Sequence, residues 1–195
     1  MDSPEIVNLP VNKHTLEKYS QIPISYEVKT VLIVDLINDG LKGIVFQKKE
    51  VAQPYIKNYD EQGRPLNWLE KFNTKNWRLF LAYMDKKLVG GLTMAYQTPG
   101  VHMLEGRDDL AVVWDIRVLT KYRHQGVGTA LFQKAITWSK EKRCQQLKVE
   151  TQNVNVNACN FYVKQGCKLG SINSFAYHGD PVSNGEVQLI WYLDL

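Results

Sequence analysis

The chain has 195 residues, of which 44% are hydrophobic and 23% are charged, with a formal net charge of +4 at pH 7. This length suits one domain of ordinary size, and the composition is too apolar for a disordered chain. The positive charge is spread along the sequence, and its densest cluster (Lys140, Lys142, Arg143) suits the negative end of a helix dipole, so we expect no nucleic-acid partner.

Three features of the sequence indicate where in the cell the protein is located. The three cysteines, Cys144, Cys159 and Cys167, are odd in number and form no CxxC pair, which predicts neither a disulfide framework nor a metal site. Residues 1–5 carry acids and no apolar stretch, unlike a signal peptide. The longest uncharged run, 88–104, is interrupted by glycines and a proline and does not suit a membrane span. We therefore expect a cytoplasmic protein with no membrane partner.

The first third of the sequence gives weak structural signals. Residues 1–20 are mixed and polar, and we expect a loose N-terminal arm, followed by a single domain over residues 21–195. Residues 24–36 are rich in β-forming side chains and predict a strand. Prolines and glycine interrupt residues 41–76, where we expect irregular structure or short helices.

From residue 78 on, strands and helices are expected in a regular order. Two strands within 78–96 form a hairpin, and a third covers 110–119. Apolar residues at steps of four, four and three predict a helix over about 126–143. The remaining elements are a strand at 147–151, a helix at 155–165, and strands at 167–177 and 186–193. This order predicts an α+β (α/β-like) fold, in which the strands at 110–119 and 147–151 run parallel through a right-handed crossover.

The sequence Arg123-His124-Gln125-Gly126-Val127-Gly128 stands between a predicted strand and a predicted helix. The first N–H groups of a helix have no partner within the helix, and the helix dipole adds positive charge there, so this position suits an anion. Glycines allow close approach of the backbone to a phosphate, and Arg123 can add a charge-assisted bond. The RxxGxG spacing alone is equally compatible with a glycine-rich helix entry without a ligand.

The context of this loop adds a resemblance. Asn155, Ala158, Phe161, Tyr162 and Gly166 follow the pattern N-x-x-A-x-x-[LF]-Y-x-x-x-G. Together with the RxxGxG loop, this pattern resembles the GNAT superfamily of N-acetyltransferases over residues 78–193. Within it, the runs Glu150-Thr151-Gln152-Asn153, Ala158-Cys159-Asn160-Phe161-Tyr162 and Trp191-Tyr192-Leu193 are similar to streptothricin acetyltransferases. The step Gly166-Cys167 departs from that family, which has phenylalanine after the glycine.

The resemblance implies a splayed mixed sheet with helices on both faces, acetyl-CoA as the cofactor and no metal. The implied cofactor-binding residues are Ile116, Arg117, Val118, Arg123, His124, Gln125, Gly126, Val127, Gly128, Thr129, Asn153, Asn155, Asn157, Ala158 and Tyr162. Tyr162 is also implied as the general acid that protonates the departing thiolate; the alternative is a core tyrosine on a helix.

The attacking amine must lose a proton, and four carboxylates are candidates. Asp115, Glu150, Asp108 and Asp109 are each a possible general base or an ordinary surface charge. Carboxylates near the site also attract a cationic acceptor, so Asp108, Asp109, Trp114 and Asp115 are the expected acceptor-binding residues.

The acceptor itself has several candidates. The family likeness favours streptothricin, and the alternatives are an aminoglycoside, a polyamine, or a protein or peptide amine. A module that binds acyl-CoA without turnover is a further alternative. A homodimer with a contribution from the apolar C-terminal strand is compatible with the sequence.

Overall fold

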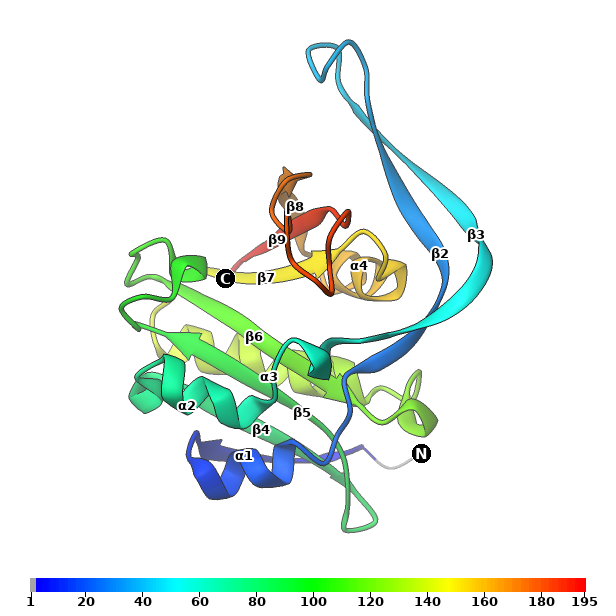
Figure 1. Ribbon diagram of the computed structural model, residues 1–195. Coiled ribbons are helices and arrows are strands. Elements are labelled where there is room, and N and C mark those ends of the chain that lie inside the picture. The colour runs from blue at the N-terminus through cyan, green and yellow to red at the C-terminus, as the bar shows by residue number, and fades with distance from the viewer. Residues whose placement is uncertain (1–2) are drawn as a thin grey trace. The chain divides into compact units, whose positions relative to one another are not determined.

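The computed structural model describes residues 3–195, which form two compact units (Figure 1). The first unit comprises the chain up to Ile24, residues 59–149 and residues 192–195, and the second comprises residues 25–58 and 150–191. Within the described residues, no helix is both long and apolar enough to cross a membrane.

The strands form one large mixed sheet and one small sheet. Across the large sheet the order is β1 (Glu5–Pro10), β4 (Arg78–Met84), β5 (Lys87–Tyr96), β6 (Leu110–Val118), β7 (Gln146–Gln152), β9 (Gln188–Asp194) and β8 (Lys168–Asn173). The small sheet pairs β2 (Ser25–Leu36) with β3 (Ile44–Asn58), and these form the long blue and cyan ribbon in Figure 1. The α-helices are α1 (Lys13–Tyr19), α2 (Trp68–Lys71), α3 (Val127–Glu141) and α4 (Val156–Lys164). The predicted α+β class is confirmed.

The centre of the first unit follows the prediction closely. β4 and β5 pair antiparallel as the expected hairpin. β6 and β7 pair parallel, and α3 connects them, which confirms the predicted strand–helix–strand unit. The helix begins at Val127 because Gly126 adopts a positive φ of 84° immediately before it. Val127, Leu131 and Ala135, which carried the helical periodicity, are all buried.

Two adjacent glycines on β5 show that helices cover both faces of the sheet in the first unit. Successive residues of a strand point to opposite faces. A Cβ atom built on Gly90 would lie 3.0 Å from Val127 and 3.3 Å from Leu131, both on α3. A Cβ atom on Gly91 would lie 2.6 Å from the ring of Tyr19, at the end of α1. The expectation of helices on both faces is therefore confirmed here, and both helices approach the strand too closely for a larger residue.

The expectation of a loose arm over residues 1–20 is wrong for the described part. β1 pairs antiparallel with β4, and α1 begins with a capping box in which Asn12 and Thr15 exchange two hydrogen bonds of 3.0 Å. Leu16 and Tyr19 are fully buried. The segment is too short to show periodicity, and its order comes from packing against the sheet.

The expectation of irregular structure over residues 41–76 is wrong in its first half and right in its second. β3 is fifteen residues long. Its pairing with β2 skips from Thr30↔Glu50 to Val28↔Tyr55, so Pro54 falls in a stretch of β3 that lies outside the paired register. A proline, which lacks an N–H, is tolerated in such a bulge. Residues 59–76 form the expected short helices, three 3₁₀ turns and α2.

The two last strands are close to the prediction, although β8 ends at Asn173 instead of residue 177. β9 lies between β7 and β8 in the sheet order, and Leu189, Ile190 and Trp191 are buried. The C-terminal strand is therefore an interior strand, and it has no open edge to offer a second copy of the chain.

Candidate active site

β6 departs from regular pairing where the cofactor was expected to bind. Its pairing with β5 shifts between Thr93↔Asp115 and Met94↔Val113, which leaves Trp114 as a bulged residue. Its parallel pairing with β7 ends at Val113↔Val149, while β6 continues to Val118. Bulges redirect a strand and are common beside active sites. The backbone of residues 116–118 thus runs beyond the β7 ladder, and the assignment of these residues to the cofactor remains a prediction.

The glycine-rich loop follows directly after β6. His124 and Gly126 both have positive φ angles, 61° and 84°, and Gly126 caps α3. A Cβ atom at Gly126 would meet nothing within 4 Å, so the space in front of the helix is open. Arg123 donates from Nε to the carbonyl oxygen of Val118 at 3.1 Å, which ties the loop to the end of β6. Burial lowers the pKa of Arg123, and a nearby anion would offset that cost.

This arrangement is able to bind an anion. The N–H groups of Val127 and Gly128 lie in the first turn of α3, where no carbonyl four residues earlier belongs to the helix. His124 and Gln125 are exposed beside them. A fifteen-residue helix also carries a full dipole at this end. The assignment of residues 123–129 to the cofactor remains a prediction.

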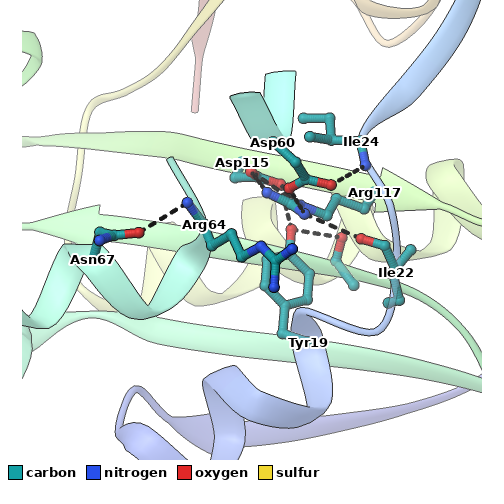
Figure 2. Close-up of polar contacts among 9 residues, drawn as sticks. Tyr19, Ile22, Ile24, Asp60, Arg64, Asn67, Asp115 and Arg117 are labelled. Atoms are coloured by element: carbon teal, nitrogen blue, oxygen red, sulfur yellow. Dashed lines mark hydrogen bonds and ion pairs between the residues drawn. The ribbon is translucent and has the colours of Figure 1, made fainter. Parts of the chain in front are cut away.

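Asp115, a predicted base and acceptor ligand, lies instead in a buried network (Figure 2). Its Oδ1 accepts from the hydroxyl of Tyr19 at 2.5 Å and from Nε of Arg117 at 2.9 Å, and its Oδ2 accepts from Nη2 of Arg117 at 2.9 Å. Arg117 is only 3% exposed. Burial alone would lower the pKa of Arg117, but the charge and hydrogen bonds of Asp115 raise it overall. Both oxygens of Asp115 accept hydrogen bonds from Tyr19 or Arg117, which argues against its predicted role as the base.

The same network includes the place where the chain leaves the first unit, at Ile24, and the place where it returns, at Tyr59. Arg117 donates from Nη1 to Asp60 at 2.8 Å and to the carbonyl oxygen of Ile22 at 3.1 Å. The other oxygen of Asp60 accepts from the backbone N–H of Ile24 at 3.3 Å, and the N–H of Tyr59 donates to the carbonyl of Ile24 at 3.1 Å. Arg117, an implied cofactor-binding residue, therefore has a side chain with a structural role.

Breaking this network is expected to destabilise the fold. Asp115→Ala leaves the buried Arg117 guanidinium without its main partner, and removal of one member of a buried pair costs about 3–5 kcal/mol. Urea denaturation should show a loss of this size. Asp108 is exposed, and Asp108→Ala should stay within about 0.5 kcal/mol of wild type. Equal stability of both variants would contradict the buried ion pair.

The other predicted acceptor residues are dispersed over different environments. Asp109 pairs with Arg107 at 2.8 Å, and hydrogen bonds from that guanidinium lower the pKa of Asp109. Trp114 belongs to an aromatic cluster, with ring centroids 5.2 Å from Phe72 and 5.1 Å from Trp77. The structure therefore gives Asp109 and Trp114 intramolecular partners that account for them without an acceptor.

In the second unit, two predicted cofactor ligands have structural roles. Asn153 donates from its side chain to the carbonyl of Leu32 at 2.9 Å and accepts from the N–H of Val187 at 2.8 Å, which joins β2 to the start of β9. Asn155 caps α4 by accepting from the N–H of Ala158 at 3.1 Å. Asn157 is exposed on the first turn of α4.

Tyr162 and Glu150, the two remaining catalytic candidates, also lie in the second unit. Tyr162 is on α4, is 2% exposed, and has its ring edge-on to Phe161 at 5.1 Å. Glu150 is half-buried on β7. Its Oε1 accepts from the hydroxyl of Tyr177 and from Nε2 of Gln152 at 3.2 Å, and its Oε2 accepts from Nε2 of Gln188 at 2.7 Å. Neither role is tested by these contacts.

Sequence reasoning missed the partners of these carboxylates. Tyr19 and Asp60 lie in segments that we expected to be loose or irregular, and Tyr177 was placed on a strand. Their partners lie far away in the sequence, so no local spacing signals the contact. The available signal was Asp115 itself, because an acidic side chain on a largely buried strand needs a cation or a hydroxyl group beside it.

A bulged strand that leaves its parallel neighbour, followed by a glycine-capped helix, is an arrangement that suits a phosphate-containing ligand. Residues 46–167 match the model of the acetyltransferase (GNAT) family, and the chain belongs to this family. It is therefore an N-acetyltransferase.

One curated relative and two solved structures are similar to this chain over most of its length. Streptothricin acetyltransferase A of Bacillus subtilis is 31% identical over 147 residues, which are 75% of this chain and 78% of that protein. A Bacillus anthracis protein assigned as a streptothricin acetyltransferase, solved with acetyl coenzyme A, superposes with a TM-score of 0.74 at 27% identity and covers 98% of this chain and 100% of its own. Nourseothricin acetyltransferase, at 24% identity, shares the fold with a TM-score of 0.76 over 97% of this chain and 98% of its own.

Proposed function

We propose that this N-acetyltransferase uses acetyl-CoA as the donor and streptothricin as the acceptor. The observation that supports the donor is the loop at residues 123–129, whose positive φ angles and open space beside Gly126 suit a diphosphate. The related Bacillus anthracis protein was solved with acetyl coenzyme A. The similarity to streptothricin acetyltransferase A of Bacillus subtilis supports the acceptor.

The chemistry would be a direct transfer. Acetyl-CoA supplies an activated thioester when bound. The residues of the loop at 123–129 would hold its diphosphate, and the backbone of residues 116–118 would orient the pantetheine. Tyr162, by its resemblance to the family motif, would give its phenolic proton to the sulfur as the C–S bond breaks. The neutral amine forms the new C–N bond and then loses a proton, so catalysis is mainly positioning with two proton transfers.

Among the four predicted carboxylates, the contacts favour Glu150 for a role toward the acceptor. Asp115 is paired with Arg117, and Asp109 is paired with Arg107. Asp108 is exposed. Glu150 accepts hydrogen bonds from neutral donors, and no ion pair to it is found among residues 3–195.

The acceptor is tested by a competition of substrates. Streptothricin, an aminoglycoside and a polyamine are offered at equal concentration with acetyl-CoA, and thiol release is recorded. We expect streptothricin to be acetylated at least about tenfold faster than either alternative, a discrimination worth about 1.4 kcal/mol. A smaller ratio would remove the streptothricin assignment and leave an N-acetyltransferase for another amine. A homodimer remains a prediction, which light scattering would test.

A further inference from the structure

Glu150 is a carboxylate held in place by neutral donors, and none of the ion pairs among residues 3–195 includes it. Three neutral donors from three segments contact it: Gln152 on its own strand, Tyr177 in the segment between β8 and β9, and Gln188 at the start of β9. An ionised carboxylate offers about four acceptor sites, and these donors use three. Oε2 of Glu150 accepts only from Gln188 in the described contacts, so it retains room for another donor.

Glu186, at the end of the same segment as Tyr177, has an unpartnered oxygen. Its Oε1 forms an ion pair with Nζ of Lys57, which also donates to the carbonyl of Val182. Its Oε2 has no hydrogen-bond partner among the described residues, although Glu186 is only 8% exposed. A buried carboxylate oxygen without a donor is costly, so an N–H donor that reached it would be favoured.

Tyr177 connects the two carboxylates electrostatically. Burial raises its pKa, and the charges of Glu150 and Glu186 raise it further. Tyr177 therefore stays protonated and donates to Glu150 at neutral pH. The two carboxyl groups of Glu150 and Glu186 share this part of the second unit with one lysine, Lys57, so acidic side chains outnumber basic ones in the cluster. A half-buried site with excess negative charge attracts a cation.

We propose that Glu150, Glu186 and Tyr177 form a subsite that binds an ammonium group of the acceptor, so that the enzyme selects diamines over monoamines. The inference deepens the proposed function, because it assumes a cationic amine as acceptor. An ammonium group carries three N–H donors, the type of group that the spare site on Glu150 and the unpartnered oxygen of Glu186 lack. This subsite replaces the acidic one that the sequence placed at Asp108, Asp109 and Asp115.

Calorimetry with two probes tests the subsite without turnover. 1,5-Diaminopentane and pentylamine have the same carbon chain and differ by one ammonium group. We expect the wild-type protein to bind the diamine at least about tenfold more tightly. Glu150→Gln and Glu186→Gln, which keep the side-chain shape and remove the charge, should each abolish most of this preference. Glu50→Gln removes an exposed carboxylate of the same unit and should leave the preference intact.

Kinetics with streptothricin separate a binding role from a structural one. Both variants should raise the KM for streptothricin about tenfold or more, with kcat and the KM for acetyl-CoA within about twofold. Because Glu186→Gln leaves Lys57 without its charged partner and destabilises the fold, Glu150→Gln and the milder Tyr177→Phe provide the same test. Variants that lower the melting temperature without moving KM or the diamine preference would overturn the subsite.

The two proposals fail in distinguishable ways. If the protein acetylates streptothricin with a KM that Glu150→Gln does not change, the subsite is wrong and the function stands. If streptothricin is not a substrate but the diamine still binds more tightly than pentylamine in a manner that depends on Glu150, the acceptor is wrong and the subsite stands.

Discussion

Replacement of Gly126 with aspartate is expected to weaken CoA binding at least about 30-fold, which corresponds to about 2 kcal/mol. The substitution places a side chain in the open space before α3 and a negative charge where the diphosphate is proposed to lie. The aspartate would also compete for the first N–H groups of the helix, because this side chain is a strong helix cap. Calorimetric titration of the protein with CoA measures the effect.

Two controls separate charge from backbone strain at this position. Asparagine has nearly the same shape as aspartate and tolerates a positive φ equally well, but it carries no charge. Gly126→Asn should therefore lose much less CoA affinity than Gly126→Asp. Gly100 has a φ of 83°, close to the 84° of Gly126, and a Cβ there also meets nothing within 4 Å. Gly100→Asp therefore imposes the same strain away from the loop and should bind CoA normally. Unchanged affinity in a folded Gly126→Asp protein would place the cofactor elsewhere.

The predictable part of the fold is the part whose signals are long and local. The periodicity of Val127, Leu131 and Ala135 predicted α3 because those side chains form the buried face of one long helix. The hairpin of β4 and β5 was predicted because its β-forming runs are separated by a short polar turn. The RxxGxG loop was located because only glycine readily adopts the positive φ that begins α3 at Gly126.

The unpredicted elements depend on partners far away in the sequence. α1 is seven residues long, and its order rests on Tyr19 packing against Gly91 of β5. β3 contains Lys48, Lys49, Glu50 and Pro54, which argue against a strand when they are taken alone. Pairing with β2 forms the strand nevertheless, because the bulge opposite Lys29 accommodates the proline.

The backbone turns of the candidate site were predictable from the sequence, and the partners of its side chains were not. A glycine pattern fixes where a loop turns, but the role of a carboxylate depends on what packs beside it. Asp115 pairs with Arg117 two residues away, which the sequence shows, but the decisive contact from Tyr19 crosses 96 residues. Asn153 was predicted to bind the cofactor from its motif, whereas its side chain joins two backbone segments of the second unit.

Tyr162→Phe is expected to lower turnover by roughly tenfold to a thousandfold, at or somewhat below the usual range for general acid catalysis. The substitution removes the phenolic proton donor and keeps the ring, whose edge-on contact with Phe161 is therefore preserved. Because the side chain is 2% exposed, a smaller residue would leave a cavity, and phenylalanine avoids this. The effect should fall on kcat, while the affinity for CoA in calorimetry stays close to that of the wild type.

A matched tyrosine shows whether this effect is specific. Tyr96 is also buried, and its hydroxyl donates to the carbonyl oxygen of Lys142 at 3.4 Å in the first unit. Tyr96→Phe therefore removes a buried phenolic hydroxyl remote from the family motif, and its kcat should match that of the wild type. A solvent-protonated sulfur would leave kcat of Tyr162→Phe equally unchanged. In that case Tyr162 would be a packing residue of α4, and the proposed general acid would be wrong even though the acetyltransferase assignment holds.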